Sequence, residues 1–232
     1  VVVDLQGRTL MPGFVDPHTH LFNDAEQSLD MTVIEAQQVA LENGITTIGD
    51  MYVTEDFLRE MQEMERAGQL QIRTSLYLVM TDPCGELQGD WWQRHPPTRV
   101  QGEQLRIGGV KIFTDGGTCE RPALSYELEP GGGLGDLFHT QEELNELVAQ
   151  AHAAGFQVAI HAIGDRAIEQ AQNAIAAALD GQPNTLRHRI EHNSVIRPEL
   201  LARYGEIGII PLIFGPYPVC EPFGPPPPPE HQ

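Results

Sequence analysis

Short apolar runs alternate along the chain with amphipathic stretches, and this alternation predicts parallel strands joined by helical crossovers. Seven runs have the length and composition of buried strands. They lie at residues 13–16, 46–50, 72–80, 109–113, 157–161, 187–191 and 207–213. The order of the segments therefore predicts an α/β fold.

The stretches between the predicted strands carry helix signals. Thr32 with Glu35, and Thr140 with Glu143, have the spacing of capping boxes, in which the two side chains bind backbone N–H groups at a helix start. An apolar stripe follows the second box, and Gly155 stands where a glycine commonly ends a helix. Further helices are predicted at residues 54–67, 165–179 and 197–204.

Two connections, at residues 81–105 and 114–139, are too long to be simple turns, and they are candidate walls of a site. Residues 215–232 include a run of five prolines, which can neither join a sheet nor continue a helix. We expect this tail to be a linker, a disordered end or a result of where the chain was cut. The chain has no initiator Met, and we expect it to begin inside a longer polypeptide.

The composition of the chain argues against several classes of function. The chain has 33 acidic and 14 basic residues, a formal charge of −19, which argues against binding to nucleic acid or to anionic membranes. Neither a membrane-spanning run nor a signal peptide is evident. Cys84, Cys119 and Cys220 are odd in number and far apart, so the sequence predicts neither a disulfide framework nor a cysteine zinc site. A reducing, cytoplasmic location fits this pattern.

Two histidines one residue apart, His18 and His20, follow the first predicted strand. The period of two turns them and Asp16 toward the same side, where both imidazoles can reach one divalent metal. Chance alone supplies roughly 0.35 such pairs in a chain with 9 histidines among 232 residues, so the pair needs partners. The alternative is that both rings bind nearby backbone groups.

Later strands supply such partners. Lys111, His161 and His192 each lie at or just past the end of a predicted strand, which is where a TIM-type (β/α)8 barrel assembles its active site. A buried lysine is costly to keep charged, so its pKa falls or a carboxylate compensates its charge. Asp115 is one candidate for that carboxylate.

Five sequence words now identify a family. The chain resembles the metal-dependent amidohydrolase superfamily, in particular the amidohydrolase 3 branch with the YtcJ-like and N-substituted formamide deformylase-like proteins. The words are LMPGFVDPHTHL (10–21), GITTIGDM (44–51), GVKIFTDGG (109–117), AIHAIGDRAI (159–168) and RIEHNSVI (189–196). They occur in the family's order, and together they are highly specific.

The resemblance implies a divalent metal centre of one or two ions, with zinc as the expected metal. Its ligands would be His18, His20, a carboxylated Lys111, His161 and His192. The implied reaction is hydrolysis of a C–N bond, in an amide or formamide of a small molecule, by a metal-activated hydroxide.

Three acidic residues would support this centre without binding the metal. Asp16 would lie beneath it, and Asp165 would cap the helix that follows His161 and help to orient that ring. Glu191 should face away from its neighbour His192 and have a structural task. The aspartate that the family places at the end of strand 8 has no match after Ile213, so the catalytic residue stays unassigned.

The resemblance to this family also predicts how the chain is divided into domains. Residues 1–12 resemble the end of a small β-sandwich and would form a linker, residues 13–214 an incomplete barrel of about seven strands, and residues 215–232 a proline-rich tail. A missing strand leaves two sheet edges unpaired, which predicts a longer chain or a homo-oligomer. Two alternatives stay open: a catalytically incomplete, metal-binding remnant, and another metal-dependent barrel hydrolase such as a phosphoesterase.

Overall fold

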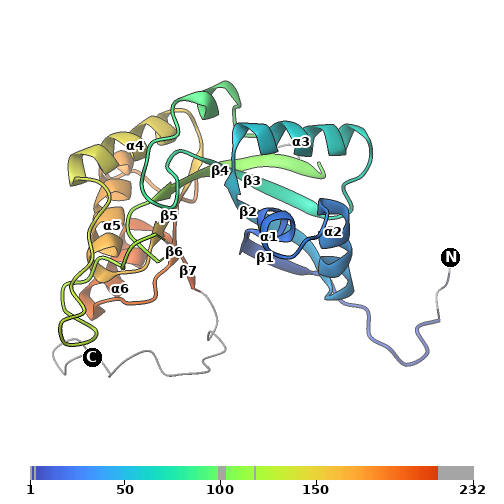
Figure 1. The fold of residues 1–232 in the computed structure, drawn as a ribbon, viewed down its shortest axis with the longest axis horizontal. Helices are drawn as coiled ribbons and strands as arrows, with labels where there is room; N and C mark the ends of the chain where they lie inside the picture. Colours follow the sequence, from blue (N-terminus) through green and yellow to red (C-terminus); the bar gives the residue numbers. More distant parts are fainter. Residues whose placement is uncertain (1, 3, 99–102, 118, 214–232) are drawn as a thin grey trace. The chain divides into compact units, whose positions relative to one another are not determined.

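The computed structural model describes residues 2, 4–98, 103–117 and 119–213, in which helices and strands alternate (Figure 1). The strands are β1 (Phe14–Thr19), β2 (Ile45–Val53), β3 (Arg73–Val79), β4 (Leu105–Phe113), β5 (Gln157–Ala162), β6 (Arg189–His192) and β7 (Ile210–Ile213). The helices are α1 (Leu21–Ser28), α2 (Val33–Glu42), α3 (Glu55–Arg66), α4 (Gln141–Ala153), α5 (Asp165–Leu179) and α6 (Pro198–Ile207), with a 3-10 helix η1 (Trp91–Arg94). All seven predicted strands are present, with shifted ends.

The seven strands form one sheet in which their spatial order is their order along the chain. Strand β1 pairs in parallel with β2, and β4, β5, β6 and β7 pair in parallel with one another. Consecutive parallel strands with alternating helices are the topology of an incomplete TIM-type barrel, so the predicted fold class is confirmed.

The chain folds into two compact units. The first comprises Val1–Leu76 and Arg99–Arg106. Phe22 of α1, Ile48 and Met51 of β2 and Leu58 of α3 are fully or almost fully buried in it. The predicted capping box of Thr32 begins α2: Glu35 N donates to the Thr32 hydroxyl, and Thr32 N donates to the Glu35 carboxylate.

The second unit comprises Tyr77–Thr98 and Ile107–Gln232. Its central strands β4, β5 and β6 are buried along almost their whole length, as parallel strands covered on both faces require. Helix α4 packs on α5, and both contact β5. The capping box of Thr140 and Glu143 begins α4 as predicted. Gly155 follows the helix with φ +83°, the left-handed conformation that glycine adopts most easily.

The connection from β3 to β4 departs from the alternation. Its described part contains only the single turn of η1, where a barrel usually has an α-helix. Trp92 of η1 is buried, and its ring centroid lies 5.4 Å from that of Phe156. The long loop therefore lies over apolar surface of the second unit that a helix would otherwise cover.

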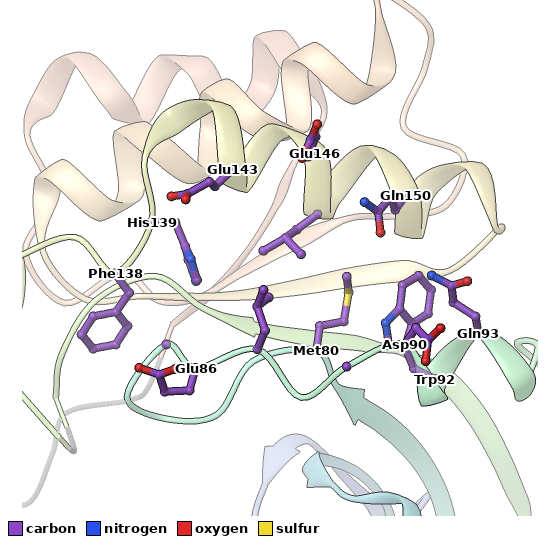
Figure 2. A pocket seen from close by; sticks show the side chains of 14 residues that line it. Met80, Glu86, Asp90, Trp92, Gln93, Phe138, His139, Glu143, Glu146 and Gln150 are labelled. Carbon is purple, nitrogen blue, oxygen red and sulfur yellow. The ribbon is translucent and has the colours of Figure 1, made fainter.

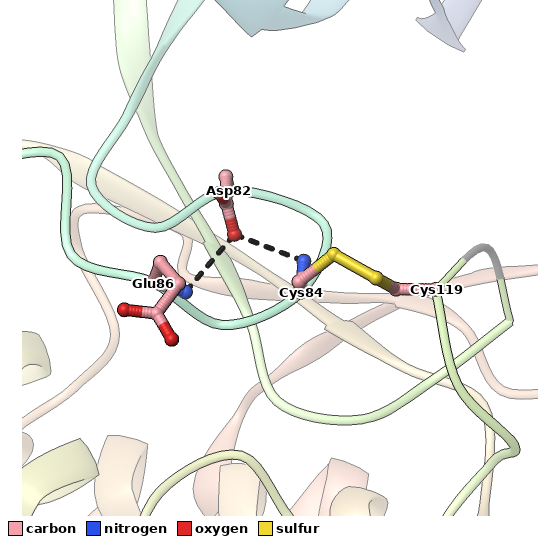
Figure 3. Close-up of a disulfide and its surroundings, with 4 residues drawn as sticks. All are labelled: Asp82, Cys84, Glu86 and Cys119. Atoms are coloured by element: carbon pink, nitrogen blue, oxygen red, sulfur yellow. Dashed lines mark hydrogen bonds between the residues drawn. A yellow bond between two sulfur atoms is a disulfide. The ribbon is translucent and has the colours of Figure 1, made fainter.

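The expectation that the cysteines form no disulfide was wrong. Cys84 and Cys119 form a disulfide with their Cα atoms 5.3 Å apart, which links the two long connections of the second unit (Figure 3). Their separation of 35 residues fits no short spacing motif, and only the folded loops bring them together. The cysteine content therefore no longer supports a reducing compartment. Cys220 lies outside the described residues.

Two remaining expectations concern the ends and the membrane. Residues 215–232, the predicted proline-rich tail, lie outside the described residues. The described part of residues 1–12, the predicted linker, contains a turn at Gln6 and Gly7 but neither helix nor strand. Within the described residues, no helix is both long and apolar enough to cross a bilayer.

Candidate metal centre

The first unit holds the histidine pair at the end of β1. His18 is buried and His20 is half-buried, and their ring centroids lie 5.4 Å apart with the planes nearly perpendicular. Asp16, which was predicted to lie beneath the metal, accepts a hydrogen bond from the backbone N–H of His18 over 3.1 Å. Its carboxylate thus holds the backbone that carries the first imidazole.

A buried carboxylate near this pair had no role in the sequence analysis. Asp50, near the end of β2, lies opposite Thr19 in the parallel register. It is fully buried, and desolvation raises its pKa to about 7 although Tyr52 N donates to Oδ1. Its Oδ2 has no hydrogen-bond partner among the described residues. The signal was an aspartate at the end of an apolar strand, within the word GITTIGDM.

The second unit holds Lys111 in the middle of an apolar strand. Its side chain is fully buried, and Nζ has no hydrogen-bond partner within the described part of the chain. Nζ lies 4.8 Å from the ring centroid of Phe113. Burial lowers the pKa of Lys111 to about 8, and the charge of Glu191 opposes this shift. The amine is therefore easier to deprotonate than an exposed lysine.

His161 and His192 meet although their positions on the strands predict otherwise. The register pairs His161 with Glu191, so alternation would turn His192 toward the other face of the sheet. The backbone of His192 is left-handed, with φ 74°, and its ring centroid lies 4.5 Å from that of His161. The two rings are therefore in contact where the backbone of His192 leaves the regular strand conformation.

Asn193 stabilises this turn. It is also left-handed, with φ 56°, and its side-chain amide donates to the carbonyl oxygens of Ile190 over 2.9 Å and Leu212 over 3.1 Å. The hydroxyl of Tyr204 donates to Asn193 Oδ1. One side chain therefore ties the end of β6 to β7 and α6.

Asp115 is the acidic residue that contacts His161. Its Oδ1 lies 3.5 Å from His161 Nε2, and its carboxylate accepts hydrogen bonds from the amides of Ala123, Ile163 and Gly164. Burial raises its pKa to about 6. Asp115 was predicted only as a possible partner of Lys111, so its contact with His161 was missed. Its three amide donors come from loops whose paths the sequence does not reveal.

The loop after Asp115 also contacts the imidazole. His161 Nε2 lies 3.1 Å from the carbonyl oxygen of Gly116. A carbonyl oxygen only accepts, so this contact assigns the ring proton to Nε2 and the lone pair to Nδ1. Nδ1 is the nitrogen with which this tautomer can bind a metal.

The predicted helix cap at Asp165 was wrong. Gly164 is the N-cap of α5, and Asp165 is the first helical residue. The carboxylate of Asp165 instead accepts hydrogen bonds from the backbone N–H and the hydroxyl of Ser125, and Arg197 Nε lies 3.5 Å away. Asp165 therefore holds a loop against the helix. Asp165 was predicted to orient His161, but the carboxylate beside that ring is Asp115.

Glu191 is fully buried and accepts hydrogen bonds from the guanidinium of Arg189. The guanidinium carbon of Arg189 lies 5.1 Å from the ring centroid of Tyr77, whose hydroxyl donates to Gln157. The carboxylate of Glu191 interacts electrostatically with both Arg189 and Lys111. This arrangement agrees with a structural task for Glu191.

The side chains of the predicted ligands are of the chemical types that bind divalent metals. Within the described residues, no three His, Cys, Asp or Glu side chains form a group that could hold a metal ion. The predicted ligands stand instead as the pair His18 and His20 in the first unit, and as Lys111, His161 and His192 in the second; we call these three the β4–β6 cluster. Imidazole nitrogens suit zinc, and the buried amine of Lys111 without a hydrogen-bond partner suits conversion to a ligand.

Comparison with known proteins identifies the class. A sequence model of the amidohydrolase family matches residues 1–40 and 27–226. The solved structure of an uncharacterised metal-dependent hydrolase from Pyrococcus horikoshii OT3 superposes with a TM-score of 0.65 and 28% identity, over 78% of this chain and 35% of that one. The chain therefore belongs to the amidohydrolase family.

Two curated relatives are similar in sequence. Protein LONG AFTER FAR-RED 3 of Arabidopsis thaliana is 31% identical over 198 residues, which are 77% of this chain and 32% of the relative. YtcJ of Bacillus subtilis (strain 168) is 36% identical over 115 residues, which are 48% of this chain and 21% of the relative. The chain thus spans about a third or less of the length of these relatives, and the YtcJ-like resemblance is confirmed.

Proposed function

We propose that this chain is part of a metal-dependent hydrolase that cleaves a C–N bond in an amide or formamide of a small molecule. The observation that carries the proposal is the β4–β6 cluster, in which a buried lysine lies on β4 and two imidazoles meet at the ends of the next two strands. Family membership and the metal-dependent hydrolases among the solved structures support it.

The metal ligands in this proposal are His18, His20, Lys111, His161 and His192, with zinc as the expected ion. When bound, a divalent metal polarises a carbonyl group and lowers the pKa of water from 15.7 to about 7. Asp16 holds the backbone of His18, and Asp115 and Gly116 hold the ring of His161. These contacts fix the imidazoles before a ligand arrives, which reduces the entropy lost on binding.

Lys111 is proposed to be carboxylated. A deprotonated amine adds to the carbon of carbon dioxide, and the proton that it loses passes to solvent, which turns a buried cation into an anionic oxygen ligand. Burial has already lowered the pKa of Lys111 to about 8, so the amine form is accessible near neutral pH. The product would lie near Glu191, whose guanidinium partner Arg189 offsets one of the two negative charges.

Metal analysis tests the ligands. We expect the protein to hold a divalent metal after dialysis, and the variants His161→Ala and His192→Ala to lose most of it. His152→Ala is the matched control, because His152 lies on α4 and its Nδ1 lies 2.8 Å from His188 Nε2, outside the cluster. Equal metal content in all four proteins would contradict the proposed ligands.

Substrate panels test the reaction. Metal-loaded protein should hydrolyse amides and formamides in preference to phosphoesters, because nothing in the sequence resembles a glycine-rich phosphate loop. Hydrolysis of phosphoesters alone would favour the alternative barrel hydrolase. Metal binding without any hydrolysis, in this chain and in a longer form that contains it, would favour the catalytically incomplete remnant.

A further inference from the structure

A cavity of about 710 Å³ lies within the second unit, between α4 and the connection that follows β3 (Figure 2). Its volume falls in the range of roughly 300–1,000 Å³ that is usual for small-molecule sites. It occupies the region where the connection from β3 to β4 lacks an α-helix. It involves none of the residues proposed to bind metal.

The lining of the cavity combines an apolar floor with an acidic rim. Apolar side chains come from Met80, Leu87, Trp92, Phe138 and Leu147. Carboxylates stand on both walls: Glu86 and Asp90 on the loop, and Glu143 and Glu146 on α4. Among the described residues, no lysine or arginine lines the cavity. Like charges on opposite walls repel one another, and a bound cation would relieve that repulsion.

His139 provides an acceptor inside the cavity. The residue is 9% exposed, and its ring points from the start of α4 toward the space between the walls (Figure 2). Nε2 lies 3.1 Å from the carbonyl oxygen of Phe113, which assigns the proton to Nε2 and leaves Nδ1 as an acceptor. Nδ1 has no hydrogen bond to any described residue. Burial lowers the pKa of His139, which favours this neutral form.

The loop wall is held in place by several local contacts. The carboxylate of Asp82 accepts hydrogen bonds from the amides of Cys84 and Glu86, and the disulfide fixes Cys84 to Cys119 (Figure 3). Gly85 has φ +86°, and a Cβ there would lie 2.5 Å from Phe138. The cavity therefore does not depend on a ligand to keep its walls apart, and little ordering entropy is lost on binding.

We propose that this cavity is a second binding site, which takes a small organic cation with an aromatic or branched apolar body and a primary ammonium group. The apolar body lies against Trp92, Leu87 and Leu147. The ammonium group donates to Nδ1 of His139 and interacts with the carboxylates of the rim. The site is independent of the metal centre, and its occupancy does not require a metal.

The chain contains only two tryptophans, Trp91 and Trp92, and both belong to η1 at this cavity. Titration with 2-phenylethylammonium should therefore change the intrinsic fluorescence saturably, with calorimetry giving the same dissociation constant. Because a charged partner strengthens a buried hydrogen bond by roughly 1–2 kcal/mol, 2-phenylethanol should bind about tenfold more weakly. The anion 3-phenylpropionate should not bind. A chelator in all titrations separates this site from the metal centre.

Two sets of variants locate the site. Glu86→Gln with Glu146→Gln removes one charge from each wall and should weaken binding of the amine about tenfold without affecting the alcohol. Glu142→Gln with Glu206→Gln changes the net charge equally at exposed positions outside the lining and should leave affinity unchanged. Leu147→Trp should fill the cavity and abolish binding, with unchanged circular dichroism.

Three results would overturn the proposal. They are the absence of saturable heat or fluorescence change with the amine, equal affinity for amine and alcohol, and equal weakening by both pairs of charge variants. Because the protein is metal-free in these titrations, a failure here leaves the proposed hydrolase function untouched.

Discussion

At the scale of the residue, the backbone at the end of β6 decides where His192 lies. His192 and Asn193 are consecutive left-handed residues, a conformation that costs a non-glycine residue roughly 1–2 kcal/mol each. The hydrogen bonds of the Asn193 side chain offset this cost. The residue after the proposed ligand is thus as important to its geometry as the ligand itself.

Substitution of Asn193 tests this point. Asn193→Leu should lower the free energy of unfolding by about 2–4 kcal/mol, because it leaves buried polar partners unsatisfied and retains the strained backbone. Asn193→Gly should cost less, since glycine accepts the left-handed conformation. Urea denaturation of the two variants measures the difference, and equal losses would contradict a backbone contribution.

His188 gives the fold a measurable pH dependence. It is fully buried, its Nδ1 accepts a hydrogen bond from Val158 N, and burial together with His152 lowers its pKa to about 4. The unfolded chain binds the proton near pH 6.5, so the stability from the neutral ring is lost as pH falls from about 6.5 toward 4. The free energy of unfolding should fall by on the order of 3 kcal/mol, since each unit of pKa difference corresponds to about 1.4 kcal/mol.

The measurement compares unfolding free energies between pH 7 and pH 4 for the wild type and for His188→Asn. Asp50 and Asp115 have raised pKa values and contribute the opposite slope over this range, so only the difference between the two proteins reports on His188. Parallel pH profiles would show that His188 does not titrate as expected.

Single residues also mark the limit of sequence reasoning. Histidines and a lysine at strand ends could be found from apolar runs and a period of two. The contact of Asp115 with His161 could not, because it depends on how the loop after β4 folds back. Asp165 was mistaken for a helix cap because aspartate is common there, whereas the extended backbone of Gly164 takes that position.

At the scale of the element, the pattern of apolar and polar residues predicts the strands and the long helices, but it does not predict the short helices. Helix α5 begins and ends where its apolar spacing predicts. Helix α1 was missed because it has eight residues, only Phe22 and Ala25 buried, and no side chain capping its start. The turn of η1 was missed because its two tryptophans are held by tertiary packing rather than by a local signal.

The contribution of the α4 capping box to stability should be measurable. Thr140→Ala removes the hydroxyl that accepts from Glu143 N and should lower the free energy of unfolding by about 1 kcal/mol. Thr140→Ser keeps the hydroxyl and should have little effect, which makes it the matched control. Urea midpoints of the three proteins check this, and a loss in the serine variant as large as in the alanine variant would speak against capping.

At the scale of the whole molecule, the disulfide is the largest departure from expectation. In the chain-entropy view, closing a loop of 35 residues stabilises the fold by about 3–4 kcal/mol. Cys84→Ser with Cys119→Ser should lose that amount and should no longer respond to a phosphine reductant. Thermal unfolding with and without reductant checks both statements, and a wild type insensitive to reductant would contradict them.

The disulfide also closes a covalent ring, and the ring encloses β4 and therefore Lys111. Within the described residues of the ring, 103–106 belong to the first compact unit, and the others belong to the second. A protease that cuts once inside the ring would leave a nicked protein of unchanged mass apart from the added water. Two fragments would separate only after both the cut and reduction, so a comparison of the cut protein on non-reducing and reducing denaturing gels reads out the connectivity directly.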